Sequence, residues 1–315
     1  MQSMELKKLL SYTRQAVDDY KLIKEGDHIA VGISGGKDSL TLLYALAGLR
    51  RFYPKKFTLT AITVDLGYDS FDLTPIKQLC EELKVPYHIV KTEIARILFH
   101  GDSVSDKAVK GSPCALCAKM RKGALNEAAQ ELGCNKVAYA HHMDDVIETY
   151  LFQKNRNMIC DWYGLKEKSV RQGYQIVRPL LNFTKSELQQ YCNDNGVSFG
   201  IDESNLTNHY TRNVIRHTQI EKMDRNEKEE WILKIQNEND FWQIKRAGIE
   251  DFLKNWNGDV DSLLNQEDAW LYLDAFLFQA LSHHFSRKYT EELCVQLKGN
   301  VLIEIENHLL ERHNE

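Results

Sequence analysis

The sequence has few prolines, no excess of positive charge and no long apolar run, and each absence excludes a class of protein. With 5 prolines and 17 glycines among 315 residues, the chain is neither collagen-like nor of low complexity. No apolar stretch approaches the roughly 20 residues that cross a bilayer. The first residues, MQSMELKKLLSYTRQAVDDY, lack the apolar segment of a signal peptide. We therefore expect a cytoplasmic protein with no membrane partner.

The balance of charge and the cysteines set two further limits. Lys and Arg number 40 against 45 Asp and Glu, a formal net charge of -5. Because a non-specific nucleic-acid binder is usually basic overall, any contact with RNA must come from local basic clusters. The 7 cysteines are an odd number, and without an export signal a disulfide framework is not expected. Five are scattered singly and are predicted to be buried apolar side chains: Cys80, Cys134, Cys160, Cys192 and Cys294.

Short apolar runs that are typical of strands alternate with stretches of helical periodicity in the first part of the chain. Strands are expected at His28–Ser34, Leu59–Val64, Pro86–Val90 and Asn135–Ala140. Helices are expected before, between and after them, including one at Arg121–Leu132. This alternation predicts an α/β protein with a parallel sheet that is covered by helices on both faces.

The pattern changes in the second part of the chain. Thr184 and Glu187 form a capping box that predicts a helix start. Beyond about Thr218 the strand signals end, and apolar residues recur at steps of three and four. At roughly 150 residues per domain, the length suggests about two domains. We predict a catalytic domain at residues 1–218, with its N-terminal helix, and a small all-α accessory domain at residues 219–315.

One short motif stands between the first predicted strand and a helix: Ser34, Gly35, Gly36, Lys37, Asp38 and Ser39. The glycines allow a tight turn that points successive backbone N–H groups into one concavity, and the helix adds the positive end of its dipole. Lys37 supplies a positive charge, Asp38 a carboxylate that can face a metal, and the serines two hydroxyls. The spacing is neither that of the Walker loop nor that of the Rossmann motif. The motif predicts an anion site of pyrophosphate size.

A second polar group follows the fourth predicted strand, in the sequence AHHMDDVIET from residue 140 to residue 149. Because the carboxyl ends of parallel strands line the ligand crevice, this segment should face the phosphate loop. Asp145 and Glu148 share one helix face, where paired carboxylates can hold Mg²⁺ or bind an ammonium group. His141 can stabilise a transferring phosphate or act in acid–base catalysis. The alternative is that the acidic residues only complement the helix dipole.

The order Ser-Gly-Gly-x-Asp-Ser between a strand and a helix resembles the signature of the N-type ATP pyrophosphatases, the PP-loop family. The resemblance implies that Ser34–Ser39 bind ATP, which is cleaved between its α- and β-phosphates with transfer of AMP to an oxygen. Asp65, just past the second strand, lies where such proteins hold adenosine, although a cap or turn role is the alternative. The His-His-x-Asp-Asp-x-x-Glu-Thr stretch resembles PP-loop enzymes that modify tRNA. It implies catalytic roles for Asp38, His141, Asp145 and Glu148, with Mg²⁺ on Asp38 and Asp145.

Two branches of that family share this stretch, the tRNA(Ile)-lysidine synthetases and the tRNA 2-thiocytidine synthetases. Cys114 and Cys117, before a basic helix with Lys119 and Arg121, are typical of the thiolation branch. There the Cys-x-x-Cys and a later cysteine hold an iron–sulfur cluster. The loop that should carry the later cysteine has none, although Cys160 or Cys192 is available elsewhere. The pair is therefore a candidate for a cluster, for persulfide chemistry or for a structural role, and Lys119 and Arg121 are candidates for tRNA contacts.

The residues after that point resemble lysidine synthetases instead: Asp-x-Ser-Asn at 202–205 and then Tyr-Thr-Arg-Asn-x-Ile-Arg-His at 210–217. Arg212 and Arg216 are four apart and can share a helix face that suits RNA phosphate or a developing phosphate charge. The alternative is a solvated basic face that pairs with Asp202 or Glu203. The resemblance favours Arg212 for catalysis and leaves Arg216 as a tRNA contact. It also implies that the helical domain contacts tRNA.

These motifs together favour an ATP-dependent ligase of the tRNA(Ile)-lysidine synthetase type. The resemblance implies that O2 of an anticodon cytidine attacks the α-phosphate of ATP, and that lysine then displaces AMP. The predicted ligands are ATP, Mg²⁺, tRNA and lysine. One alternative is tRNA cytidine 2-thiolation with Cys114 and Cys117, and another is a nucleotide-binding module without catalysis. The sequence leaves the oligomeric state open, a homodimer included.

Overall fold

The computed structural model of the chain describes residues 2–67, 72–99, 113–155, 167–169, 173–197, 211–281, 285, 287–299, 302–305 and 308–311. These residues form two compact units. The first consists of Met1–Ile147 with Gly164–Glu229, and the second of Glu148–Tyr163 with Glu230–Glu315. The helices α6 (Met143–Lys154) and α9 (Arg225–Asn255) begin in the first unit and continue into the second.

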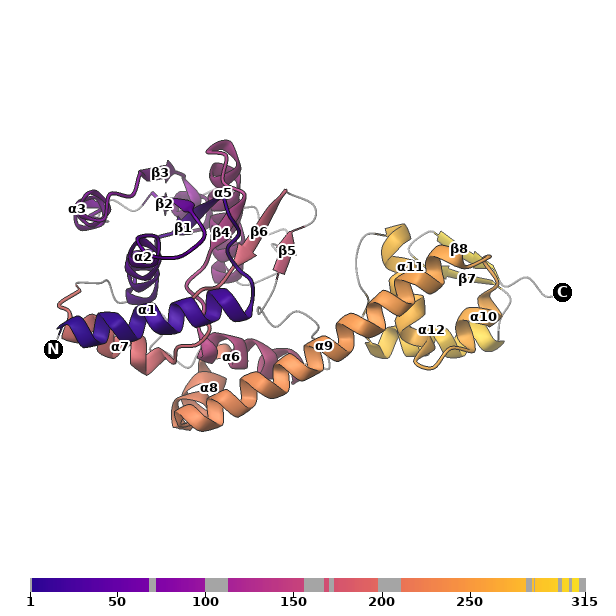
Figure 1. Cartoon of the computed structure of the whole chain (residues 1–315). Helices are drawn as coiled ribbons and strands as arrows, with labels where there is room; N and C mark the ends of the chain where they lie inside the picture. Colours follow the sequence, from indigo (N-terminus) through magenta and orange to yellow (C-terminus); the bar gives the residue numbers. More distant parts are fainter. Residues whose placement is uncertain are drawn as a thin grey trace. The chain divides into compact units, whose positions relative to one another are not determined.

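The first unit is built on a six-stranded sheet in the order β3-β2-β1-β4-β6-β5 (Figure 1). The strands are β1 (Asp27–Gly32), β2 (Phe57–Asp65), β3 (Tyr87–Lys91), β4 (Lys136–Ala138), β5 (Glu167–Ser169) and β6 (Tyr174–Val177). All neighbours pair in parallel except the edge strand β5, which is antiparallel to β6. The predicted parallel α/β sheet is thus confirmed, and β5 and β6 extend it beyond the four strands that were expected.

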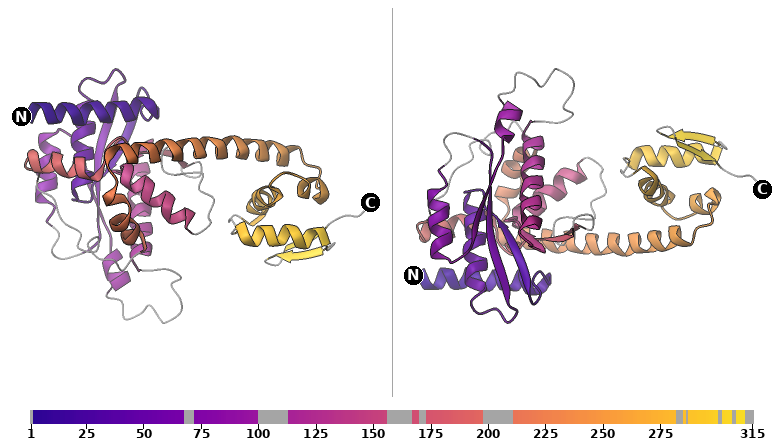
Figure 2. Two further views of the ribbon diagram at one scale, coloured as in Figure 1. Left: turned by 90° about the horizontal axis from the view of Figure 1, so that it is seen from below. Right: turned by 90° about the horizontal axis from the view of Figure 1, so that it is seen from above.

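Helices cover both faces of this sheet (Figure 2). The helices of the first unit are α1 (Gln2–Asp19), α2 (Lys37–Leu49), α3 (Thr74–Glu82), α4 (Ile94–Phe99), α5 (Pro113–Glu131), α7 (Lys185–Asp194), α8 (Thr211–Thr218) and the short 3₁₀ helix η2 (Ile220–Lys222). On one side α1, α2 and α7 pack against one another, with α2 next to β1 and β2. On the other side α5 packs against β2, β3 and β4, and α4 packs against α5.

The centre of the sheet is apolar on both faces because helices cover both of them. Ile29, Ala30 and Val31 of β1 have no exposed surface. Leu125 of α5 packs so closely on β1 that a Cβ on Gly32 would lie 2.8 Å from its Cδ2 atom. Gly32 is therefore the residue that lets α5 approach the last position of β1, directly before the phosphate loop.

The second unit is mostly helical, as predicted. Besides the continuations of α6 and α9 it contains α10 (Val260–Leu264), α11 (Ala269–Leu281) and α12 (Arg287–Gly299). Its core includes the buried side chains of Leu263, Leu273, Leu277, Leu293 and Leu297. The all-α prediction missed an antiparallel hairpin of β7 (Leu302–Ile305) and β8 (His308–Glu311). None of the helices in the described ranges has the length and apolar character that a membrane span requires.

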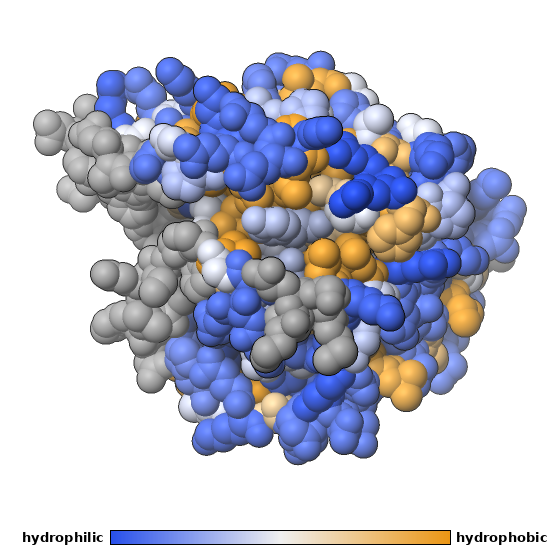
Figure 3. All heavy atoms as spheres, turned by 60° about the vertical axis from the view of Figure 1, so that its left-hand side comes forward, coloured by the Kyte–Doolittle hydropathy of each residue, from blue (hydrophilic) through white to orange (hydrophobic). Residues whose placement is uncertain are grey.

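Polar side chains dominate the face of the molecule in Figure 3, and apolar ones gather in patches between them. A cavity of about 460 Å³ is lined by Leu6, Lys7, Leu10, Ser11, Arg14 and Phe52. It lies between α1 and the turn that follows α2, at the opposite end of α2 from the phosphate loop. The cavity is therefore separate from the candidate site.

Candidate nucleotide-binding and catalytic site

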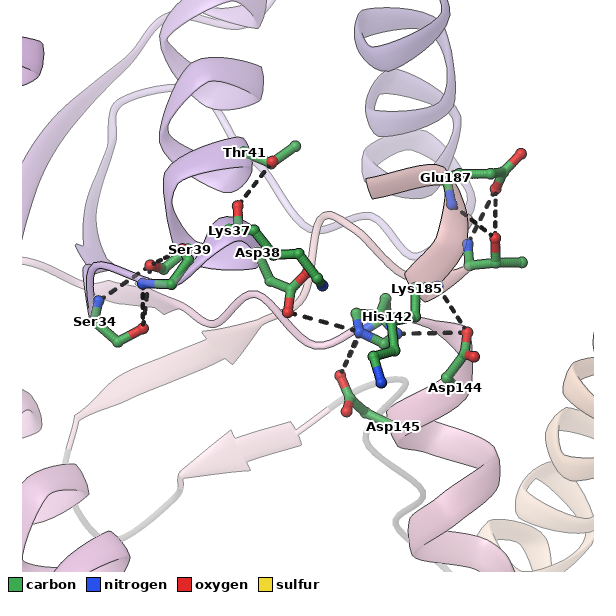
Figure 4. A network of polar contacts seen from close by, with 12 residues as sticks. Ser34, Lys37, Asp38, Ser39, Thr41, His142, Asp144, Asp145, Lys185 and Glu187 are labelled. Carbon is green, nitrogen blue, oxygen red and sulfur yellow. Dashed lines mark hydrogen bonds and ion pairs between the residues drawn. The ribbon is translucent and has the colours of Figure 1, made fainter. Parts of the chain in front are cut away.

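The phosphate loop is shaped by hydrogen bonds of its own serines (Figure 4). Gly35 has a φ of 80°, a conformation that glycine adopts without the steric cost a side chain would bring. The hydroxyl of Ser39 donates to the carbonyl of Gly36 at 2.8 Å and accepts from the backbone N–H of Ser34 at 3.1 Å. Ser39 is 5% exposed, so its side chain maintains the turn, whereas Ser34 is exposed to solvent.

The phosphate loop continues into the first turn of α2, which carries two charged side chains. Lys37 is the first residue of that helix, and its ammonium group contacts the carboxylate of Asp38. The first backbone N–H groups of a helix have no partner within the helix and attract anions. The described geometry is therefore that of a preformed anion site, with a cation and a carboxylate at its rim.

His142 lies at the centre of the site, among carboxylates from two elements (Figure 4). Its Nε2 atom is 3.4 Å from Asp145 Oδ2 and 3.9 Å from Asp38 Oδ2, and its Nδ1 atom is 3.6 Å from Asp144 Oδ2. The side chain is only 4% exposed. The phosphate loop and the start of α6 thus meet at this imidazole, as the predicted position of both at the carboxyl edge requires.

The carboxylates and the imidazole stabilise one another's charged forms. Burial alone would lower the pKa of His142, but the negative charges of Asp145, Asp144 and Asp38 outweigh it and raise the pKa. Burial would likewise raise the pKa of Asp145, but the charge of His142 and a hydrogen bond from its backbone N–H lower it. A positively charged imidazole is therefore favoured between the carboxylates.

Asp144 anchors this cluster to two other helices. Its Oδ1 atom accepts from Lys228 Nζ at 2.7 Å, and its Oδ2 atom accepts from the backbone N–H of Lys185 at 2.9 Å. Burial opposes the charge of Asp144, but His142, Lys228 and Lys185 together lower its pKa. The first turns of α6, α7 and α9 are consequently fixed around a single carboxylate.

His141 has a separate partner. Nε of Arg178, directly after β6, donates to Nδ1 of His141 at 3.1 Å. The imidazole ring also contacts the ring of Tyr139, with the centroids 5.8 Å apart. The residue as a whole is exposed to solvent; its ring is nevertheless surrounded by protein atoms, and this desolvation lowers its pKa to about 4, with Arg178 adding to the effect. The surroundings therefore act oppositely on the neighbouring histidines: they raise the pKa of His142 and lower that of His141.

Asp65 ends β2, beside β1 and its loop. Its side chain accepts from the backbone N–H of Gly67 at 2.9 Å, and its carbonyl accepts from Thr92. The turn role that was the alternative for this residue is thus present. The second oxygen of the carboxylate could still contact adenosine, and this contact stays a prediction.

The remaining predicted catalytic residues lie on α6 and α8. Glu148 is 3% exposed and lies one turn beyond Asp145. Arg216 is half-buried, and its positive charge contributes to the low pKa of Asp145. Arg212 is exposed, one turn before Arg216 on α8. Arg216, which was predicted as a tRNA contact, thus acts electrostatically on a carboxylate of the cluster.

The Cys-x-x-Cys pair lies in the first turn of α5, which begins at Pro113 and not at Arg121 as predicted. Because α5 runs into β4, its first turn lies at the carboxyl edge of the sheet, the edge of the phosphate loop. Cys117 is half-buried, and Lys119 and Arg121 are exposed on the same helix. For Cys114 only the backbone position is described.

An iron–sulfur cluster takes about four thiolates, and Cys117 is the one member of the predicted pair whose side chain is described, so the cluster stays a prediction. Cys80, Cys134, Cys192 and Cys294 are buried, and burial raises the pKa of each thiol, to about 11 for Cys80 and Cys134. These four confirm the prediction of apolar cysteines, and Cys160 lies outside the described residues. No group of three His, Cys, Asp or Glu side chains suited to a metal ion occurs in the ranges given above.

Four site residues were not singled out from the sequence: His142, Asp144, Arg178 and Lys228. The first two stand within the predicted HHMDD segment, where the choice between neighbouring residues depends on the direction of each side chain. Arg178 stands before Pro179, outside both polar motifs. Lys228 belongs to a helix that looked like an ordinary amphipathic element, and no local signal marks it.

A phosphate loop between a parallel strand and a helix, faced by a buried histidine among carboxylates, defines a nucleotide-binding α/β protein. The model of the PP-loop domain family matches residues 5–223. The chain therefore belongs to the PP-loop family of ATP pyrophosphatases, which confirms the resemblance that its motifs suggested.

Similar proteins come from both branches. A tRNA-cytidine(32) 2-sulfurtransferase of Geobacter sulfurreducens is 36% identical over 196 residues, which is 61% of this chain and 73% of that protein. A protein of the same name from Pelobacter propionicus is 36% identical over 186 residues, 58% of this chain and 66% of that protein. A tRNA(Ile)-lysidine synthase of Thermosipho africanus is 35% identical over 211 residues, 66% of this chain and 47% of that protein.

A solved structure has the same fold. The U34-tRNA thiolase NcsA of Methanococcus maripaludis, determined with its [4Fe-4S] cluster, matches with a TM-score of 0.51 and 21% identity. The match covers 71% of this chain and 81% of the thiolase. At this identity the match supports the architecture of the sheet and its helices and carries no residue role.

Proposed function

We propose that this protein is an ATP-dependent tRNA-modifying enzyme that activates a cytidine with ATP and replaces its C2 oxygen with sulfur. One observation carries the proposal. The Cys-x-x-Cys in the first turn of α5 lies at the carboxyl edge of the sheet that bears the phosphate loop and the His142 cluster. The sulfurtransferase relatives, which this chain matches over about two-thirds or more of their length, support the same choice.

The first step is adenylation. The C2 oxygen of the cytidine attacks the α-phosphorus of ATP, the bond to the β-phosphate breaks, and pyrophosphate leaves. The backbone N–H groups of the phosphate loop and the ammonium of Lys37 hold the leaving phosphates. The base must be splayed out of its RNA to reach the site, as single-stranded recognition usually requires.

Mg²⁺ fits the rim of this site. Asp38 and Asp145 each face His142, and a magnesium ion is usually held by one or two carboxylates together with substrate phosphates. When bound, the ion would neutralise charge on the phosphates. The same carboxylates raise the pKa of His142, so binding of the ion and protonation of His142 would oppose each other.

In the second step, sulfur replaces the adenylated oxygen at C2. A sulfur nucleophile attacks C2 of the adenylated base, the C2–O bond breaks, and AMP leaves with the former base oxygen. Cys114 or Cys117 would carry the sulfur as a persulfide, which an external sulfane-sulfur donor supplies. Its outer sulfur is the nucleophile at C2, and the thiolate of the other cysteine then breaks the S–S bond, so that the thiolated base is released, a disulfide of the pair remains and an external thiol reduces it. The thiolate is the reactive form of a cysteine, and the start of a helix favours it.

The test uses the full chain under anaerobic conditions with an unmodified tRNA transcript, Mg-ATP, a low-molecular-weight persulfide as the sulfur donor and a thiol reductant. The RNA is digested and its nucleosides are analysed by mass spectrometry. We expect 2-thiocytidine only when ATP is present. The double variant Cys114→Ser Cys117→Ser should lose it while keeping tRNA-dependent release of pyrophosphate, because adenylation precedes the sulfur step. Cys294→Ala, a buried cysteine of the second unit, is the matched control.

Two outcomes would overturn the proposal. If the double variant formed as much 2-thiocytidine as the wild type, the two cysteines would have no part in the reaction. Absence of tRNA-dependent pyrophosphate release from the wild type would remove the adenylation step and favour a nucleotide-binding module without catalysis.

Ligation of lysine is the second candidate, and one observation favours it. The helix α8 carries the Arg-Asn-x-Ile-Arg-His order that resembles lysidine synthetases, and Arg216 acts on Asp145. In this reaction the lysine amine, in place of sulfur, attacks C2 and displaces AMP. A parallel reaction with radiolabelled lysine decides between the two, since label in the RNA of a tRNA(Ile) with a CAU anticodon would establish the ligase.

A further inference from the structure

Arg178 and His141 meet at the carboxyl edge of the sheet. They follow β6 and β4, which are neighbours in the register Ala138↔Val177, so the two residues leave the sheet side by side. Arg178 is 8% exposed. Its Nε atom donates to Nδ1 of His141 at 3.1 Å. A buried guanidinium is thus directed at one particular nitrogen of an imidazole that borders the candidate site.

This contact selects one form of the histidine. A guanidinium has only donors and keeps its proton in proteins, so Nδ1 of His141 must accept with its lone pair. The proton of the neutral ring then lies on Nε2. In a doubly protonated ring, the N–H at Nδ1 would face the N–H of Arg178 Nε, and the hydrogen bond would be lost. Arg178 therefore excludes both the other tautomer and the cation.

On balance, the charged groups around the His141 ring also disfavour its protonated form. Asp145 of α6 favours the cation, whereas Arg178, His142 and Lys122 of α5 oppose it. Tyr139 packs on the ring, and the ammonium of Lys122 lies 5.8 Å from the centroid of the Tyr139 ring. Desolvation of the ring is the largest cause of the lowered pKa of His141, about 4, and the three positive groups add to it. The ring is consequently neutral throughout the physiological range.

We infer that Arg178 is a positioning residue that holds His141 as the Nε2–H tautomer, a neutral hydrogen-bond donor to an oxygen of the reacting phosphate or base. This inference rests on the proposed adenylation. It decides between the two roles that the sequence left open for His141, because a ring whose Nδ1 is occupied and whose Nε2 carries the proton has no lone pair left for a base. A fixed neutral donor aimed at developing charge lowers a barrier without a proton transfer.

The first experiment needs no substrate. The full chain is labelled with ¹⁵N-histidine, and a long-range ¹H–¹⁵N spectrum assigns the tautomer of His141, with His141→Gln to identify its signals. We expect the Nε2–H tautomer and no titration down to about pH 5. Arg178→Met should move the midpoint toward the ordinary 6.5, whereas Arg178→Lys, which keeps a cationic donor, should retain the low midpoint.

Arg50→Met is the matched control, since Arg50 donates to the backbone carbonyls of Leu83 and Lys84, away from this site. Its His141 signals should equal those of the wild type. An Nδ1–H tautomer in the wild type, or a midpoint that Arg178→Met leaves unchanged, would overturn the inference.

The second experiment measures pyrophosphate release against pH. Above the midpoint of His141, Arg178→Met should release pyrophosphate more slowly than the wild type, because its neutral ring is no longer held in one tautomer and one orientation. Below that midpoint the cation carries Nε2–H in every molecule, so the loss should shrink, and Arg178→Lys should recover most of it at high pH. A loss that is equal at every pH would mark Arg178 as merely structural and overturn the inference. If tRNA-dependent pyrophosphate release is absent altogether, the proposed function fails, while the NMR result still decides the tautomer.

Discussion

Asp144 and Lys228 form a buried ion pair, with 2.7 Å between Asp144 Oδ1 and Lys228 Nζ and side chains that are 5% and 6% exposed. The pair joins the first turn of α6 to the first turn of α9, directly beside His142. Arg225, also in the first turn of α9, contacts Glu187 of α7. The start of the helix that continues into the second unit is therefore fixed by charges that border the candidate site.

Lys228→Met should destabilise the protein by about 3–5 kcal/mol, because Asp144 would remain buried without its cation. Urea unfolding followed by tryptophan fluorescence measures the loss. Lys154→Met is the control, since Lys154 is 52% exposed in its pair with Glu238 and such a pair contributes at most about 1 kcal/mol. Adding Asp144→Asn to Lys228→Met should recover part of the loss, and a loss no larger than that of the control would contradict the assignment.

Acid should destabilise the sheet through Asp27. Lys136 Nζ lies 2.8 Å from Asp27 Oδ2, the backbone N–H of Lys24 donates at 2.6 Å, and Asn135 Nδ2 donates at 2.8 Å. Burial would raise the pKa of Asp27, but these donors lower it below the ordinary 3.8. Because the folded pKa is the lower one, the stabilisation is fully present above about pH 4 and is lost as the pH falls through the folded pKa.

Unfolding midpoints in urea at neutral pH and at about pH 3 test this expectation. Asp27→Asn should be less stable than the wild type at neutral pH and should lose less stability on acidification. Glu93→Gln, whose carboxylate is 63% exposed in its pair with Arg96, should follow the wild type. Equal losses for Asp27→Asn and the wild type would show that another carboxylate governs the acid response.

Local signals predicted the central strands and the capping box of Thr184 and Glu187, which the structure forms with both of its hydrogen bonds. They failed where elements are short, as in the three-residue β5 and the four-residue β6, because periodicity needs a longer window. The start of α5 was placed too late, although proline at the first helical position is itself a start signal. Lys228 and Asp144 are 84 residues apart, and no pattern in the chain announces such a contact.

The two glycines of the phosphate loop should respond differently to alanine. Gly35 has a φ of 80°, where an L-residue costs about 1–2 kcal/mol. Gly36 has a φ of -77°, and a Cβ there would meet only Ser34 Oγ at 3.5 Å. Without nucleotide, Gly35→Ala should therefore lower the free energy of unfolding by about that amount, and Gly36→Ala should leave it almost unchanged. Equal losses in urea unfolding would contradict the loop geometry.

Thiol reagents should distinguish the cysteine pair from the core cysteines. Cys80 and Cys134 are buried with a pKa of about 11 against the ordinary 9.0, so their thiolate fraction at neutral pH falls about a hundredfold. Timed alkylation of the native protein, read by peptide mass spectrometry, should label Cys117 long before either of them. In urea all cysteines should react at similar rates. Labelling of Cys80 as fast as Cys117 in the native protein would contradict the packing.

The two arginines of α8 should affect different steps. Arg216 is half-buried and acts on Asp145, whereas Arg212 is exposed. At saturating tRNA, Arg216→Met should reduce pyrophosphate release by roughly 10²-fold, the typical effect of removing a group that stabilises transition-state charge. Arg212→Met should instead weaken tRNA binding and reduce its salt dependence by the equivalent of about one phosphate contact. Filter-binding titrations at several salt concentrations and pyrophosphate assays separate the two effects. The reverse pattern would restore the assignment that the resemblance to lysidine synthetases implied, with Arg212 at the reacting phosphate.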